Sequence, residues 1–131
     1  MSALHAEYVA RSTAPRTARR DVRAWAQHLP ADCAVDLVIA VNELITNAVK
    51  HGPDFGRVRL LITRQTDSLL FIEVADEGLP QAVATRPPDA TSGRGLHMVD
   101  TIATDWGVSY HPTRTWFTMR VALPADRVVT P

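Results

Sequence analysis

The stretch from Asp32 to His51 constrains the fold more than any other part of the sequence. Its apolar residues have helical periodicity, and Asp32 is a suitable N-cap. Gly52 and Pro53 follow directly, which predicts that the helix ends at His51 with Gly52 in the left-handed conformation. Apolar side chains fill most of the helix circumference, namely Leu37, Val38, Val41, Leu44, Ile45, Ala48 and Val49. A helix of this kind must be covered on most sides, so the sequence predicts a packed core around it.

A narrow polar stripe interrupts the apolar surface of this helix. At about 100° per residue, one side of the helix carries Asp36, Glu43, Asn47 and Lys50. The stripe has two interpretations, either a solvated helix face or the wall of a ligand cleft. The helical pattern by itself favours the solvated face.

The other segments predict an α+β fold. Further helices are expected from Ser12 or Thr13 to Leu29 and over 93–104, and strands over 7–10, 57–63, 69–74, 106–110 and 115–123. The strand 69–74 is almost continuously apolar, which predicts a central place in the sheet, whereas 7–10 is expected at an edge. Strands that follow one another in pairs form hairpins, and the helices can cover one face. We therefore expect a two-layer α/β sandwich with a mixed, mostly antiparallel sheet covered on one face by helices, in a single domain over residues 1–131 with its core at about 12–124.

The composition narrows the classes of partner and compartment. Lysine plus arginine and aspartate plus glutamate both number 14, so the formal net charge is zero. Direct binding of nucleic acid or of an anionic membrane, which needs a basic excess, is therefore not expected. The single cysteine, Cys33, cannot form an internal disulfide and is expected to be a buried thiol. With no long apolar segment or signal peptide in the sequence, the prediction is a cytoplasmic protein.

Two further segments carry chemistry. An apolar strand ends at Asp76, followed by Glu77 and Gly78, and such an acid can accept a hydrogen bond from an exocyclic amine while the glycine admits a flat ring. Later, Gly93 and Gly95 flank Arg94 where a helix is expected to begin, an arrangement suited to binding an anion. Each segment has an ordinary alternative when taken alone, a turn in the first case and a flexible loop in the second.

Taken together and in this order, the three segments resemble the nucleotide-binding motifs of the GHKL (Bergerat-fold, histidine kinase-like) ATPases. The resemblance is strongest to the anti-sigma-factor serine/threonine kinases and covers about residues 12–124. Glu43-Leu44-x-x-Asn47-Ala48-x-x-His51-Gly52 is similar to the N-box, Asp76-x-Gly78 to the first glycine box, and Gly93-Arg94-Gly95-Leu96-x-x-Val99 to the second. Thr115 stands where the family has a threonine beside the adenine.

The resemblance implies that ATP and Mg²⁺ are the cofactors. It assigns Asn47 as the Mg²⁺ ligand, Glu43 as the general base of phosphoryl transfer, and Asp76 as the acceptor for the adenine amino group. The remaining nucleotide-binding positions that it implies are His51, Gly78, Gly93, Arg94, Gly95, Leu96 and Thr115. The implied partners are a sigma factor and a small antagonist protein of the anti-sigma factor, and a homodimer is possible within the family.

Three departures from the family pattern bear on catalysis. Pro80 follows the first glycine box, the segment between Gly78 and Gly93 is short and carries further prolines, and the turn before the last strand reads Pro112-Thr113-Arg114. Two alternatives to a serine/threonine kinase stay open. One is a non-catalytic module that sequesters a partner in the presence of ATP. The other is the detached catalytic domain of a histidine kinase, which Lys50 in the N-box favours.

Overall fold

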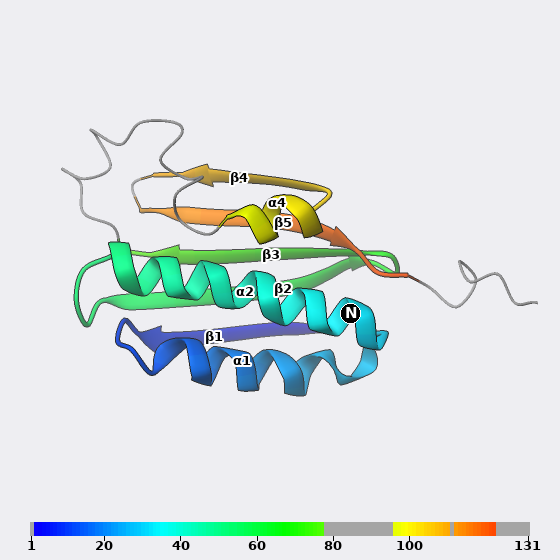
Figure 1. The fold of residues 1–131 in the computed structure, drawn as a ribbon, viewed down its shortest axis with the longest axis horizontal. Helices are drawn as coiled ribbons and strands as arrows, with labels where there is room; N and C mark the ends of the chain where they lie inside the picture. The colour runs from blue at the N-terminus through cyan, green and yellow to red at the C-terminus, as the bar shows by residue number, and fades with distance from the viewer. Residues whose placement is uncertain (1, 78–95, 111, 123–131) are drawn as a thin grey trace, which may run out of the picture.

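The chain forms two layers, a sheet and a set of helices packed on one of its faces (Figure 1). The computed structural model describes residues 2–77, 96–110 and 112–122. The elements follow one another as β1 (Ala3–Val9), α1 (Ala14–Trp25), the 3-10 turn η1 (Ala26–His28), α2 (Ala31–His51), β2 (Arg57–Thr66), β3 (Leu69–Asp76), α4 (His97–Ile102), β4 (Asp105–Ser109) and β5 (Arg114–Arg120). The predicted α+β sandwich is confirmed.

The sheet has five strands in the order β1-β2-β3-β5-β4. As predicted, the apolar strand β3 is central and the N-terminal strand β1 is at an edge. Each pair of neighbouring strands is antiparallel. The expected, mostly antiparallel sheet is therefore confirmed, and among the described strands the pairing is antiparallel throughout.

Strand alternation divides the sheet into a buried face and an open face. On β2, Val58, Leu60 and Ile62 are buried against the helices, while Arg57 and Arg59 point to the opposite side and are exposed. The same alternation buries Leu70, Ile72 and Val74 on β3 and Phe117 and Met119 on β5. In the helix layer, α2 contributes more fully buried residues than α1 or α4, among them Leu37, Val41 and Ile45, so the helix that most constrains the sequence is also the main helix of the core.

Two polar contacts attach α1 to its neighbours. Arg19 Nη1 donates a hydrogen bond to Asn42 Oδ1 of α2 at 2.6 Å. Tyr8 of β1 donates its hydroxyl hydrogen to Asp21 Oδ2 of α1 at 2.7 Å. Burial of Tyr8, together with this hydrogen bond and the charge of Asp21, raises the pKa of the tyrosine well above its ordinary value of 10.0. The neutral tyrosine is thus part of the folded structure.

Both ends of α2 differ from the sequence expectation. Pro30 occupies the N-cap position, and Asp32 lies in the first turn, where its charge favours the helix N-terminus. Gly52 is extended, with φ −86° and ψ 176°, so the predicted left-handed stop is wrong. The positive φ belongs instead to Phe55, at 57°. In the described part of the chain, no helix combines the length and hydropathy that a membrane span requires.

Candidate functional site

The C-terminal half of α2 carries a partly buried polar edge. Glu43 and Asn47 are half-buried, whereas Asp36, earlier on the same edge, is exposed. Asn42 lies about 140° around the helix from Asn47 and bonds to Arg19 of α1. Because α2 lies between α1 and α4 (Figure 1), the edge with Glu43 and Asn47 faces away from α1, toward the side of α4. The half of the stripe that the motif uses is therefore not a simple solvated face.

The end of α2 lies directly against the end of β3. A Cβ atom placed on Gly52 would lie 3.4 Å from Cγ and 3.5 Å from Cβ of Asp76. The same Cβ would also lie 2.7 Å from the carbonyl oxygen of Ala48, which is closer than real Cβ atoms approach. Gly52 is thus required by the close approach of the Ala48 carbonyl oxygen rather than by a left-handed turn, and its distances to Asp76 show that the first two sequence motifs lie side by side.

Asp76 is the last residue of β3, and its carboxylate points toward the helix layer. It lies two residues after Val74 and four after Ile72, both of which are buried, so all three side chains lie on the face that the helices cover. Its backbone N–H donates to the carbonyl oxygen of Thr113 at 2.9 Å. Its Oδ1 atom is buried. A buried carboxylate oxygen is a strong hydrogen-bond acceptor, so this strand end can select a ligand that offers an N–H group.

Thr115 and His51 lie near the same end of the sheet. Thr115 on β5 is half-buried and pairs with Val74, which is two residues before Asp76. Thr115 therefore lies on the same face of the sheet as Asp76. His51 is the last residue of α2, directly before Gly52; it is half-buried and its Nε2 atom is buried. The structure therefore gathers residues from α2, β3 and β5 around the Gly52–Asp76 contact.

The second glycine box is described only at its last residues. Leu96 is 4% exposed and directly precedes α4, and its carbonyl oxygen accepts a hydrogen bond from the N–H of Asp100 at 2.9 Å. Val99, fully buried, anchors α4 in the core. The other predicted binding residues, Gly78, Gly93, Arg94 and Gly95, lie outside the described residues, as do Pro80, Pro87 and Pro88.

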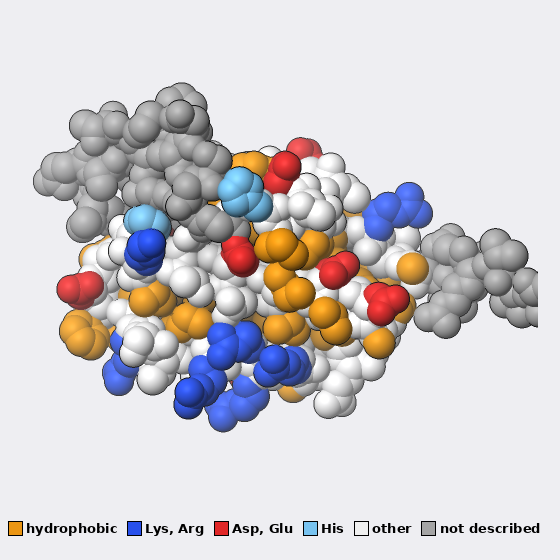
Figure 2. All heavy atoms as spheres, viewed as in Figure 1, with side chains coloured by type: hydrophobic (Ala, Val, Ile, Leu, Met, Phe, Trp, Pro, Cys, Tyr) orange, Lys and Arg blue, Asp and Glu red, His pale blue; other side chains and the backbone are white. Residues whose placement is uncertain are grey.

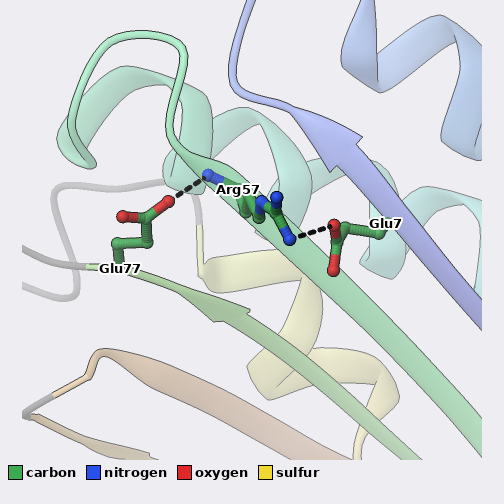
Figure 3. Close-up of polar contacts among 3 residues, drawn as sticks. All are labelled: Glu7, Arg57 and Glu77. Carbon is green, nitrogen blue, oxygen red and sulfur yellow. Dashed lines mark hydrogen bonds and ion pairs between the residues drawn. The ribbon is translucent and has the colours of Figure 1, made fainter.

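One charged cluster beside the site was not found from the sequence. Glu77, next to Asp76, accepts a hydrogen bond through Oε1 from the backbone N–H of Arg57 at 2.7 Å (Figure 3). Arg57 Nη1 in turn forms an ion pair with Glu7 Oε1 at 3.2 Å, so one residue joins β1, β2 and the end of β3. The alternation of charges on β2 could have indicated an open sheet face, but the partners of Arg57 depend on the strand register.

Cys33 lies away from these residues, near the start of α2. It is buried, and its Sγ is 3.9 Å from the carbonyl oxygen of Arg120. Burial raises the pKa of the thiol, the charge of Asp36 raises it further, and Arg64 partly opposes both effects. The thiolate is therefore disfavoured, which agrees with the expected buried thiol and not with a nucleophile.

The comparisons with known proteins agree with this arrangement. The fold is similar to the crystal structure of the RsbU and RsbW domains of Rv1364c from Mycobacterium tuberculosis, with a TM-score of 0.73 and 22% sequence identity. The match covers 92% of this chain and 32% of that one, so the chain spans about a third of that structure's length. No curated protein sequence matches the chain. The family model described as the histidine kinase-like ATPase domain matches residues 8–121. The chain therefore belongs to the histidine kinase-like ATPase domain family.

Proposed function

We propose that the chain is an ATP-binding regulatory protein that acts as an anti-sigma factor and phosphorylates a serine or threonine of a small antagonist protein. The observation that carries this proposal is the closeness of Gly52 to Asp76. It places the N-box on α2 beside the first glycine box on β3, two segments that the family resemblance assigns to nucleotide binding.

The residues at this contact fit the adenine part of ATP. The absence of a side chain at Gly52 keeps open the space beside the Asp76 carboxylate, which a Cβ atom would enter. In the proposed complex, Asp76 accepts a hydrogen bond from the adenine 6-amino group. Guanine carries a carbonyl oxygen at this position, so a carboxylate there disfavours GTP. Thr115 lies on the same sheet face and is proposed to support the ring edge.

The polar edge of α2 fits the phosphate side of the same ligand. Asn47 lies about one helical turn before Gly52 and offers an amide oxygen, the kind of ligand that Mg²⁺ accepts. When bound, Mg²⁺ would neutralise part of the negative charge of the phosphates. Gly93, Arg94 and Gly95 are proposed to contribute backbone N–H groups and a guanidinium to the phosphates.

Glu43 is proposed as the general base. It precedes Asn47 by one helical turn on the same half-buried edge. Along α2, it therefore lies farther from Asp76 than the proposed Mg²⁺ ligand Asn47 does. From there its carboxylate can take the proton of an incoming serine or threonine hydroxyl while the phosphoryl group is transferred. The position suits proton transfer better than a primary contact with the nucleotide.

A second candidate function is an ATP-dependent module that sequesters a partner without turnover. The prolines at positions 80, 87 and 88 favour it, because the sequence departs there from the family pattern in the segment between the two glycine boxes, which is expected to cover the phosphates. Glu43, Asn47 and Asp76 are all retained, so this alternative shares the nucleotide site and differs only in the chemical step.

The experiment has two stages. The tagged chain is used to retain partners from lysate with and without Mg·ATP, and the retained proteins are identified by mass spectrometry. Transfer from labelled ATP to each partner is then measured for the wild type, Glu43→Ala, and the control Asp67→Ala, which removes an exposed carboxylate beyond the opposite end of β3. The proposal predicts that Glu43→Ala slows transfer by about 10²–10⁴-fold and that the control does not. Transfer at an unchanged rate by Glu43→Ala would contradict the proposed mechanism, and no transfer by the wild type would favour the non-catalytic module.

A further inference from the structure

A cavity lies on the helix layer, between the end of α1 and the first half of α2. Its volume is about 460 Å³. Its lining is mostly apolar and consists of Arg23, Ala26, Gln27, Leu29, Ala31, Ala34, Val35, Val38 and Ile39. None of these residues belongs to the motifs that carry the proposed nucleotide site.

Large apolar side chains of this groove reach the surface. Val35 is 57% exposed and Ile39 is partly exposed, while Val38 is only 8% exposed and forms the floor. Val35 and Ile39 are one helical turn apart and therefore lie side by side on the outside of α2. Figure 2 shows hydrophobic side chains gathered over this part of α2. An exposed apolar patch that continues into a cavity is typical of a protein-binding surface.

Charges of opposite sign border the groove on its two sides. Along α1, Arg16, Arg20 and Arg23 are exposed, and Figure 2 shows blue side chains over this helix. None of these arginines forms an ion pair with another residue of the described ranges. Along the far side of α2, Asp32 and Asp36 are exposed. This basic edge is concentrated on one helix of a chain whose formal net charge is zero.

We propose that this groove binds an amphipathic α-helix of a partner protein, with acidic side chains along the edge that faces α1. The ridges of two packed helices leave a groove that receives apolar anchors spaced three and four residues apart. The arginines of α1 attract the acidic edge, and Asp32 and Asp36 favour basic residues on the opposite edge, which fixes the orientation of the bound helix. The proposal rests on the proposed function only in taking the partner to be a protein; the groove needs no nucleotide.

The test uses synthetic peptides of about 18 residues, long enough to form a helix on binding. The first peptide has a leucine stripe with glutamates along one edge and lysines along the other. The second has lysines along both edges. Calorimetric titrations without nucleotide compare the wild type with Val35→Asp, Arg23→Glu and Phe55→Asp. The last is a matched control, because Phe55 is 72% exposed, lies outside the groove lining, and has a φ of 57° that aspartate tolerates.

The wild type is expected to bind the first peptide at least about tenfold more tightly than the second. Val35→Asp is expected to weaken binding of the first peptide by at least about tenfold, with Phe55→Asp unchanged. Arg23→Glu should narrow the difference between the peptides, because it reverses one charge of the basic edge. Since Val35 and Arg23 are exposed, both variants should retain the wild-type melting temperature, and Arg23→Glu carries the test if Val35→Asp does not fold.

Equal affinity for the two peptides, no binding of either, or unchanged binding by Val35→Asp would overturn the proposal. Sedimentation of the same variants tests the other occupant: a wild-type dimer that Val35→Asp converts to a monomer would assign the groove to a second copy of the chain and would also overturn it. Because the titrations contain no nucleotide, ATP binding without peptide binding refutes only this inference, and peptide binding without ATP binding refutes only the nucleotide site.

Discussion

Gly52 and Asp76 lie close together where the end of α2 meets the end of β3, because a Cβ atom placed on Gly52 would be only 3.4 Å from Cγ of Asp76. The same Cβ atom would lie too close to the carbonyl oxygen of Ala48, which explains why a glycine follows the N-box helix even though its backbone is extended. The space beside the Asp76 carboxylate is thus bounded by a residue of another motif.

Substitution of Gly52 by alanine should therefore damage both stability and the site. The new Cβ would lie 2.7 Å from the Ala48 carbonyl oxygen, which is backbone and cannot easily move. We expect Gly52→Ala to lower the free energy of unfolding by about 1–3 kcal/mol, as overpacking does, and to weaken ATP binding. Urea unfolding and calorimetry measure the two effects.

Val22→Ala is the control for stability, because it opens a cavity at a fully buried position of α1, remote from the motif residues. It should lower the free energy of unfolding by a comparable amount and leave ATP affinity unchanged. Equal losses of ATP affinity in both variants would show that the effect of Gly52→Ala comes from instability and not from the site.

Two asparagines on α2 should separate binding from stability. Asn47→Ala should reduce ATP affinity in the presence of Mg²⁺ by about tenfold or more, with little change in melting temperature, because the side chain is proposed to face the ligand. Asn42→Ala should do the opposite, since it removes the hydrogen bond from Arg19. Its expected cost is about 1–3 kcal/mol of unfolding free energy. Thermal unfolding and calorimetry of the two variants measure stability and ATP affinity. A collapse of stability in Asn47→Ala with unchanged ATP affinity would show that Asn47 has a structural role.

The contact between Tyr8 and Asp21 predicts a loss of stability at alkaline pH. The pKa of Tyr8 is raised in the folded state, chiefly by burial, so the folded chain holds this proton more tightly than the unfolded chain does. The contribution of Tyr8 to the free energy of unfolding is complete below the ordinary tyrosine pKa of 10.0 and is lost as the pH rises above that value. Tyr8→Phe should cost about 1.5–3 kcal/mol at neutral pH and give a flatter pH dependence above 10.0. Denaturant unfolding across this range measures both, and parallel curves for the two proteins would contradict the prediction.

Local sequence signals predicted most of the architecture. The apolar run of β3 predicted its central place in the sheet. The apolar side chains around most of the circumference of α2 predicted its role in the core, because both features reflect burial within one segment. Strand lengths were less predictable. The first strand extends over Ala3–Val9 rather than 7–10, because an edge strand is lengthened by pairing with β2, which lies some fifty residues later in the chain.

The sequence predicted the motif residues of the candidate site but not how they are held. That Asp76 donates its N–H to Thr113, and that Glu77 accepts one from Arg57, depends on strand register and on turn geometry. The role of Gly52 was predicted wrongly for the same reason. A glycine after a helix usually marks a left-handed turn, and its contact with Asp76 is visible only once α2 and β3 are placed together.

A calorimetric comparison of Mg·ATP and Mg·GTP on the wild type, on Asp76→Asn and on the surface control Asp67→Asn is the decisive experiment for the adenine site. The wild type is expected to bind ATP at least about tenfold more tightly than GTP. Asp76→Asn is expected to lose about 1–3 kcal/mol of ATP binding free energy, and Asp67→Asn to bind as the wild type does. Equal affinity of the wild type for ATP and GTP, or full ATP affinity in Asp76→Asn, would contradict the assignment of the adenine site to Asp76.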